Sequence, residues 1–157
     1  MDDKVTATVS NPSLATTASY SFWFNANIIG GQRGIISNWN DGGIKINFAS
    51  PPNLTVGFRK TAASGGSFTN CNTNNSFVIQ QWYHVVVVYN AGTMAMYKDV
   101  MLDNSCVGDT TVTNSAAYNI GFNNDNTAYF NGLIDDVRVY NRALSPEEIK
   151  RLYNMGR

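Results

Sequence analysis

The clearest pattern in the chain is an alternation of apolar and polar side chains with a period of two residues. Over residues 19–26, one face is formed by Tyr20, Phe22 and Phe24. The side chains between them belong to the opposite face: Ser21, Trp23 and Asn25. Residues 43–50 repeat the alternation. Because successive side chains of a strand point to opposite faces, both segments are predicted to be half-buried β-strands.

Residues 81–90 differ, because apolar side chains occupy both faces of the expected strand. Such a pattern is typical of a central strand that is covered on both sides. Residues 93–105 are expected to form two short strands that fold back around Lys98 and Asp99. Clusters of Gly, Asn and Pro separate the segments at spacings that favour many short antiparallel strands.

The end of the chain carries the signals of an α-helix. Ser145 is the expected N-cap, Pro follows at the first helical position, and Glu148 completes a capping box. Leu144 and Ile149 have the spacing of a hydrophobic staple. Apolar side chains recur at helical spacing as far as Tyr153, so the helix is expected to dock one apolar stripe onto a sheet.

The length and composition limit the function classes. A chain of 157 residues can bury a sizeable core, so residues 1–157 are expected to form a single domain. Charged residues make up 14% of the chain against a norm of about 25%, which suits an exported β protein. The 11 basic and 11 acidic residues cancel, so no nucleic-acid partner is expected. No apolar run approaches the roughly 20 residues of a membrane span.

The two cysteines, Cys71 and Cys106, leave two states open: one disulfide or two free thiols. A disulfide would suit a secreted β domain, because both cysteines lie in polar, Asn-rich segments. The first residues lack the charged and then apolar pattern of a secretion signal. Either the protein stays inside the cell, or the sequence is a module of a longer exported chain.

Four segments of the chain resemble a known family: Y-S-F-W-F-N, W-Y-H-V-V-V-V-Y-N, Y-F-N-G-L-I-D-D-V-R-V-Y and L-S-P-E-E-I. In these segments the chain is similar to the laminin-G-like and pentraxin-like branch of the concanavalin A-like lectin/glucanase superfamily. The resemblance implies an all-β fold, namely a two-sheet antiparallel jelly-roll sandwich with one short C-terminal helix. This architecture hosts lectins, adhesion domains and hydrolases alike, so the fold does not identify the function.

The resemblance also implies a calcium site, because pentraxin-like relatives build one from loop carboxylates and amides. The corresponding loops here place the metal ligands at Asp41, Asn123 and Asp125. Asn123 stands where the family usually has Glu, and Ala128 stands where it has a ligating Gln. Calcium affinity rises with the number of charged ligands, so low affinity is expected. The alternative is that Asn and Asp only shape these loops through bonds to the backbone.

The same loops carry the candidate ligand-binding side chains. Trp39 lies in a polar segment, where an exposed indole ring would stack on the apolar face of a sugar. Tyr129 would extend this surface. The residues expected to bond the sugar hydroxyls are Asn40, Asn124 and Asn126. The alternative is that Trp39 folds back over a sheet edge and is buried.

Two adjacent acids, Asp135 and Asp136, interrupt the alternation of the last expected strand. Regular alternation would place Asp135 on the same apolar face as Val137, where an unpaired carboxylate is costly. A β-bulge at this position is therefore expected, which would leave Asp136 to pair with Arg138 or to bond loop amides. This structural role is favoured over metal ligation.

No catalytic residues are expected. Sugar hydrolysis normally needs two carboxyl groups about 5 to 9 Å apart, and the glucanases of the superfamily carry theirs on one strand. The only glutamates here, Glu147 and Glu148, lie at the expected helix N-terminus. His84, the sole histidine, lies in the most apolar strand and is expected to be a structural histidine bonded to backbone.

The sequence therefore favours a non-catalytic carbohydrate-binding or adhesion module of a larger exported or surface protein. Its expected partners are a polysaccharide or glycoconjugate and neighbouring domains of the parent protein. Calcium, at low affinity, is the candidate cofactor. The alternative is a structural or protein-interaction sandwich that binds no small ligand. A glucanase-type enzyme is the third and least favoured hypothesis.

Overall fold

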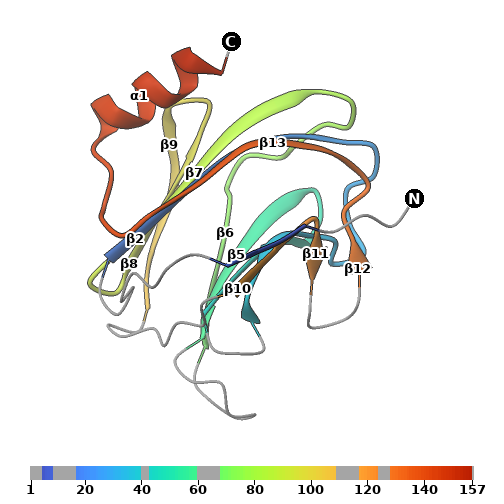
Figure 1. Ribbon diagram of the computed structural model, residues 1–157, viewed down its shortest axis with the longest axis horizontal. Coiled ribbons are helices and arrows are strands. Elements are labelled where there is room, and N and C mark those ends of the chain that lie inside the picture. Colours follow the sequence, from blue (N-terminus) through green and yellow to red (C-terminus); the bar gives the residue numbers. More distant parts are fainter. Residues whose placement is uncertain are drawn as a thin grey trace.

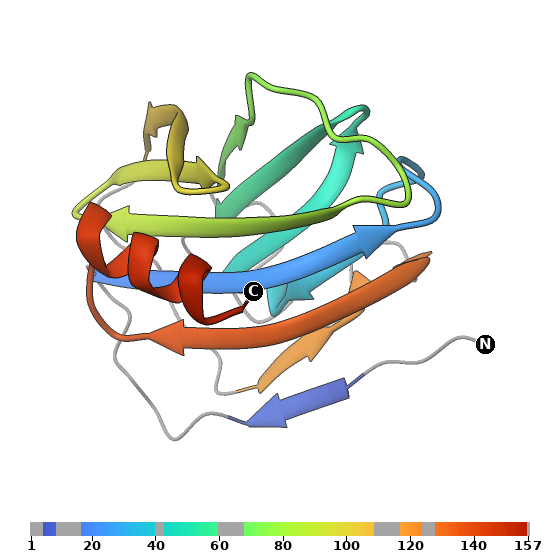
Figure 2. The ribbon, with the colours of Figure 1, turned by 90° about the horizontal axis from the view of Figure 1, so that it is seen from above.

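Two antiparallel sheets pack face to face, and one helix lies on the outer face of the second sheet (Figures 1 and 2). The computed structural model describes residues 5–8, 17–39, 43–59, 68–108, 117–123 and 128–156. The first sheet has six strands in the order β1-β10-β3-β4-β5-β6, and the second has five in the order β13-β2-β7-β8-β9. A short β11-β12 hairpin is separate from both. The predicted antiparallel jelly-roll sandwich is confirmed.

The strands of the six-stranded sheet are β1 (Val5–Thr8), β3 (Gly34–Ser37), β4 (Ile44–Ser50), β5 (Asn53–Arg59), β6 (Phe68–Asn72) and β10 (Ala117–Ile120). Those of the five-stranded sheet are β2 (Thr17–Ala26), β7 (Trp82–Asn90), β8 (Thr93–Lys98), β9 (Met101–Val107) and β13 (Gly132–Tyr140). The hairpin consists of β11 (Phe122–Asn123) and β12 (Ala128–Tyr129), and the helix is α1 (Pro146–Met155).

The core between the sheets is formed by the inward faces that the alternation predicted. The aromatic face of β2 and the apolar face of β4 are both fully buried there. In β7, Tyr83, Val85 and Val87 enter the same core, whereas Val86 and Val88 lie on the other face beneath the helix. The strand with apolar residues on both faces is the middle strand of the five-stranded sheet, as predicted.

The β8–β9 turn differs by one residue from the prediction. Its central residues are Asp99 and Val100, and both have positive φ, at 47° and 80°. The Asp99 amide donates to the His84 carbonyl oxygen at 2.9 Å, and the His84 amide donates to Asp99 Oδ1 at 3.0 Å. These two bonds to β7 hold the turn in a backbone conformation that a β-branched residue rarely adopts.

The predicted β-bulge in β13 is confirmed. The pairing register of β13 with β2 shifts between Asp135 and Arg138, and Asp136 has a φ of 48°. The shift lets Ile134 and Val137 both pack against the core, with the acids at the sheet margin. Asp136 Oδ1 accepts from Arg138 Nε at 2.9 Å and pairs with Nη2 at 2.8 Å, so of the two expected partners the structure has Arg138.

The helix begins as its capping signals predicted. The Ser145 hydroxyl accepts from the Glu148 amide at 3.3 Å, and the Ser145 amide donates to Glu148 Oε2 at 2.9 Å. Ile149 and Leu152 are buried against Val86 of β7, which fastens α1 across the five-stranded sheet (Figure 2). No helix in the described part of the chain is long and apolar enough to cross a membrane.

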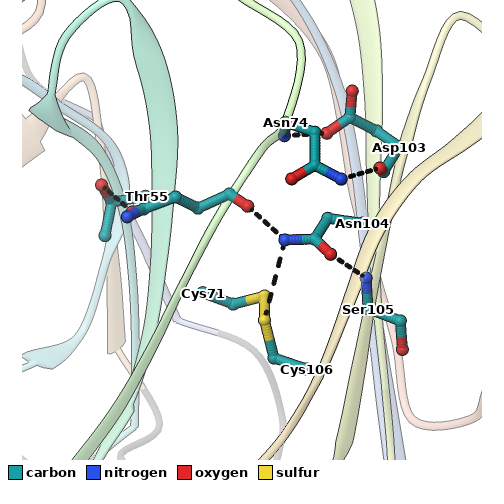
Figure 3. The surroundings of a disulfide bond; sticks show 8 residues. Thr55, Cys71, Asn74, Asp103, Asn104, Ser105 and Cys106 are labelled. Atoms are coloured by element: carbon teal, nitrogen blue, oxygen red, sulfur yellow. Dashed lines mark hydrogen bonds between the residues drawn. A yellow bond between two sulfur atoms is a disulfide. The ribbon is translucent and has the colours of Figure 1, made fainter.

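A disulfide joins the two sheets. It links Cys71 of β6 to Cys106 of β9, with the Cα atoms 5.9 Å apart. β6 and β9 are the end strands of their sheets, so the bond closes one edge of the sandwich. Asn104 lies beside it, with Nδ2 3.9 Å from Cys106 Sγ (Figure 3). Of the two states left open by the sequence, the structure has the disulfide.

Candidate functional site

The expected stacking platform at Trp39 is wrong. The Trp39 side chain is only 4% exposed. Its ring packs against Gly57, and the ammonium nitrogen of Lys45 lies 4.2 Å from the ring centroid. Lys45 and Gly57 are register partners whose neighbours in β4 and β5 fill the core, so both belong to the outer face of the six-stranded sheet. Trp39 folds back over that face, which is the buried alternative.

Asn123 is also buried, and its side chain serves the fold. Its Nδ2 donates to the Gln32 carbonyl oxygen at 2.9 Å, and its backbone packs directly on Gly34. Through this contact the β11–β12 hairpin packs on β3. Tyr129, the register partner of Phe122 in that hairpin, is half-buried with the two ring centroids 4.8 Å apart. The other candidate loop residues lie outside the described residues: Asn40, Asp41, Asn124, Asp125 and Asn126.

One feature beneath this hairpin bears on the calcium prediction. Asn47 is the register partner of Gly34, is fully buried, and has no hydrogen-bond partner among the described residues for either its Oδ1 or its Nδ2. Buried polar side chains are normally bonded, so an unpartnered amide oxygen is a potential ligand for a hard cation. Within the ranges that the structure describes, no group of three or more His, Cys, Asp and Glu side chains is placed to hold a metal.

A cleft of about 750 Å³ lies elsewhere, on the outer face of the five-stranded sheet beside the C-terminal end of α1. Pairing between strands places Asp135, Trp23 and His84 in one row across β13, β2 and β7. Trp82 is two residues before His84 in β7 and therefore lies on the same face. α1 ends at Met155, and the described residues leave this part of the sheet face open.

Aromatic rings form the floor and one wall of the cleft. Trp23, at the floor, is 9% exposed and stacks on Tyr153 of the helix, with ring centroids 5.4 Å apart and 21° between the planes. Gly156 packs over the indole nitrogen of Trp23, which has no hydrogen-bond partner among the described residues. Trp82 is 41% exposed. Of the three tryptophans in the chain, Trp82 is the exposed one.

Three carboxylates line the same cleft, and each uses one oxygen within the protein. Asp135 Oδ1 accepts from the Asp136 amide at 2.7 Å. Asp136 Oδ1 binds Arg138, and Asp99 Oδ1 accepts from the His84 amide. The second oxygen of each carboxylate has no hydrogen bond to the part of the chain that the structure describes. The cleft thus holds oriented acceptors on either side of an aromatic floor.

His84 lies beside the cleft as a structural residue. Its ring centroid is 5.1 Å from that of Trp23, and its Nε2 is 2.9 Å from the Ser21 hydroxyl. His84 is buried in the sheet as expected, but the expected ring bond to backbone is wrong, because the ring bonds a hydroxyl. Burial lowers the pKa of His84 to about 4, against the opposing effect of the nearby Asp136 carboxylate. The imidazole is therefore neutral near pH 7.

The sequence pattern contained part of the signal for this cleft. Trp23 interrupts the otherwise polar face of the first strand, and Trp82 and His84 share one face of the central strand. A tryptophan on a nominally outer face marks either a covered surface or a binding surface. Only the pairing of β13 with β2 and of β2 with β7 shows that Asp135 belongs to the same place.

Comparison with a curated protein identifies a relative. The chain is 30% identical over 102 residues to Adhesion G-protein coupled receptor V1 of Danio rerio. The match covers 60% of this chain and 2% of the receptor.

Solved structures share the fold. Domain 4 of AbnA, a GH43 extracellular arabinanase from Geobacillus stearothermophilus solved in complex with arabinotriose, has a TM-score of 0.72 at 20% identity. The match covers 88% of this chain and 67% of that one. The binding domain of Botulinum Neurotoxin DC in complex with SialylT has a TM-score of 0.71 at 19% identity, over 98% of this chain and 40% of that one.

The sequence pattern of one family covers nearly the whole chain. Residues 2–150 match the concanavalin A-like lectin/glucanases superfamily, in its laminin-G-like branch. The match spans both sheets and the start of α1. It agrees with the two-sheet sandwich that the structure shows. The chain therefore belongs to the concanavalin A-like lectin/glucanases superfamily.

Proposed function

We propose that this domain is a non-catalytic carbohydrate-binding or adhesion module, and that the cleft on the five-stranded sheet is its binding site. The observation that carries the proposal is Trp82, an exposed indole ring beside carboxylates that each keep one oxygen free of bonds to the described chain. A sugar ring offers an apolar face for stacking and hydroxyl groups that donate to such oxygens.

The size of the cleft supports the proposal. Its volume of about 750 Å³ falls within the range of about 300–1,000 Å³ that is typical of small-ligand sites. Apolar rings with a few placed polar groups are also the usual lining of such sites. The superfamily and the arabinotriose complex of the AbnA domain point to the same ligand class.

The spacing of the acids supports a non-catalytic role. Asp135 lies on β13, and β2 and β7 are the next two strands of the sheet. Asp99 follows beyond β7, in the turn whose amide donates to the His84 carbonyl oxygen. Three strand spacings of about 4.8 Å separate the two backbones by roughly 14 Å. Retaining and inverting glycosidases hold two carboxyl groups about 5 to 9.5 Å apart across one scissile bond. Here each of the two carboxylates has one oxygen bonded to a backbone amide, at opposite ends of the row of strands, which favours a role as fixed acceptors for sugar hydroxyl groups.

The disulfide and the relatives support an extracellular setting. Disulfides persist in oxidising compartments, and Cys71–Cys106 closes an edge of the sandwich. The curated relative is named an adhesion receptor, of which the matching region is a small part. We therefore place the domain in a larger exported or surface protein, with a polysaccharide or glycoconjugate as its partner.

The experiment is a glycan array with the full chain, followed by calorimetric titration of the best oligosaccharide. Wild type and Trp82→Ala are compared, with Val107→Ala as the matched control because Val107 is an exposed apolar residue far along β9. We expect Trp82→Ala to weaken binding at least tenfold and Val107→Ala to leave it unchanged. Equal loss in both variants, or no glycan bound by wild type, would favour the structural or protein-interaction alternative.

Fluorescence gives an independent readout of the same site. Iodide quenches exposed tryptophans, and of the three in the chain Trp82 is the exposed one. The bound oligosaccharide should therefore reduce iodide quenching of wild type. If the oligosaccharide also reduces iodide quenching in Trp82→Ala, the ligand binds elsewhere.

Calcium assistance is a separate part of the proposal. The ion would be held by the ligand set that the resemblance implies, Asp41, Asn123 and Asp125. The buried amide of Asn47 has no hydrogen-bond partner within the described chain, and its strand partner Gly34 packs on Asn123, which supports such a site. A ligand that binds only the folded form raises the melting temperature. Millimolar calcium should raise it in wild type and not in Asp125→Asn. If calcium does not change the melting temperature of wild type, the alternative holds, in which the Asn and Asp side chains of these loops only bond the backbone.

A further inference from the structure

We propose that the cleft selects uncharged glycans and rejects glycans that carry carboxylate or sulfate groups. The inference rests on the proposed function, and it concerns the ligand class of that same site. It follows from the charges that line the cleft and from the way in which the chain already uses them.

Among the described residues that line it, the cleft carries an excess of two negative charges. Asp99, Asp135 and Asp136 contribute three carboxylates, and Arg138 contributes one guanidinium. The guanidinium is committed to Asp136 through two contacts of 2.8 and 2.9 Å. Asp99 and Asp135 therefore have no counter-charge among the described lining residues. Asp135 begins the row that continues through Trp23 to His84, and Asp99 bonds to His84 at the other end.

The two unbalanced carboxylates are held in fixed orientations. A backbone amide donates to one oxygen of each, from Asp136 to Asp135 and from His84 to Asp99. An oriented carboxylate accepts hydroxyl donors in a charge-assisted hydrogen bond, which is stronger than a neutral one. A neutral sugar offers many such donors, whereas an anionic group offers only further acceptors.

An anionic ligand is also repelled by the negative charges of Asp99 and Asp135. A ligand anion seated on Trp82 or Trp23 lies between the two acids, close to an apolar floor where the field is weakly screened. We expect an anionic glycan to bind at least about tenfold more weakly than its neutral parent. Because the effect is electrostatic, added salt should narrow the difference, while the affinity for a neutral glycan should stay constant.

The test uses pairs of oligosaccharides of nearly the same size and shape that differ in one carboxylate. The pairs are sialyllactose with its neutral methyl ester, and the best neutral ligand from the array with its uronic-acid form. Affinities are measured with the full chain at low and high salt. The variants are Asp99→Asn and Asp135→Asn, in which the amide oxygen can still accept the backbone bond. Glu147→Gln is the matched control, because it removes one charge in the first turn of α1, about 9 Å along the helix axis from Tyr153, the first helical residue that lines the cleft.

The expected result is a preference for the neutral member of each pair that shrinks severalfold in the two Asp→Asn variants and is unchanged in Glu147→Gln. Equal or tighter binding of the anionic member would overturn the inference and leave the proposed function standing. A preference that survives both Asp→Asn variants would also overturn it. If neither member binds and the array is empty, the proposed function itself fails.

Discussion

The indole ring of Trp23 lies nearly parallel to the phenol ring of Tyr153, with the centroids 5.4 Å apart. Trp23 belongs to β2 and Tyr153 to the last turns of α1, so the pair fastens the end of the helix to the sheet. The same end of the helix forms a wall of the cleft. The docking of α1 and the shape of the proposed binding site therefore depend on one aromatic contact.

Removing this contact should loosen the helix. We expect Tyr153→Ala to lower the free energy of unfolding by about 1–2 kcal/mol, because a half-buried ring and its aromatic partner are lost. Urea denaturation measures the change. Tyr153→Phe keeps the stacked ring and is expected to stay close to wild type, so an equal loss in both variants would mean that the hydroxyl group and not the stack matters.

The buried His84 predicts a pH dependence of stability. Its pKa is about 4 in the folded state, below the usual 6.5, so the unfolded chain takes up a proton on acidification before the folded one does. Stability is then fully present above pH 6.5 and falls as the pH drops toward 4. Between pH 7.5 and 5 the loss should be about 2 kcal/mol.

Urea titrations at pH 7.5 and 5 measure this loss, and His84→Gln serves as the control. The variant is expected to be less stable than wild type at pH 7.5, with a smaller difference between the two pH values. An unchanged pH dependence in His84→Gln would assign the effect to another group.

The disulfide should contribute strongly to stability. Cys71 and Cys106 are 35 residues apart in sequence, and closing a loop of that length stabilises the fold by about 4 kcal/mol in the chain-entropy account. Reduction with dithiothreitol should lower the melting temperature by roughly 10 °C. The double variant Cys71→Ser/Cys106→Ser should show the lower melting temperature with and without reductant. A melting temperature of wild type that does not respond to reductant would contradict the prediction.

The N-cap of α1 offers a local test. In Ser145→Ala the Glu148 amide loses its hydroxyl acceptor, and we expect a loss of about 1 kcal/mol in the free energy of unfolding. Thermal melting followed by circular dichroism measures it. Ser145→Asp restores an acceptor at the cap and should recover most of the stability. If Ser145→Asp is as unstable as Ser145→Ala, the hydroxyl has a role other than capping.

Several features of this fold could be read from the sequence because they depend on neighbouring residues. The faces of β2 and β7 follow from the period of the strand, so the burial of Phe22 and Val87 was predictable. The start of α1 follows from Ser145 and Glu148, which interact across three residues. The bulge at Asp136 follows from the cost of placing an acid on an apolar face.

The candidate site could not be read in the same way. The segment around Trp39 is polar, yet the Trp39 ring is buried against Lys45 and Gly57. These two residues are brought together by the pairing of β4 with β5, which the packing of the whole sheet determines. Similarly, nothing in the segment around Cys71 shows that its strand ends the first sheet opposite Cys106.

The sequence by itself determined the inward faces of β2, β4 and β7 and the helix cap, since these rest on periodicity and on hydrogen bonds between near neighbours. It also indicated the family, through the resemblance of four short segments. Only the tertiary structure decided the cleft, where strand pairing brings Trp23 and Asp135 together and the end of the helix leaves Trp82 uncovered. The physical reason is that strand register and helix docking are set by the packing of the complete core, in which each segment's energy depends on partners distant in the chain.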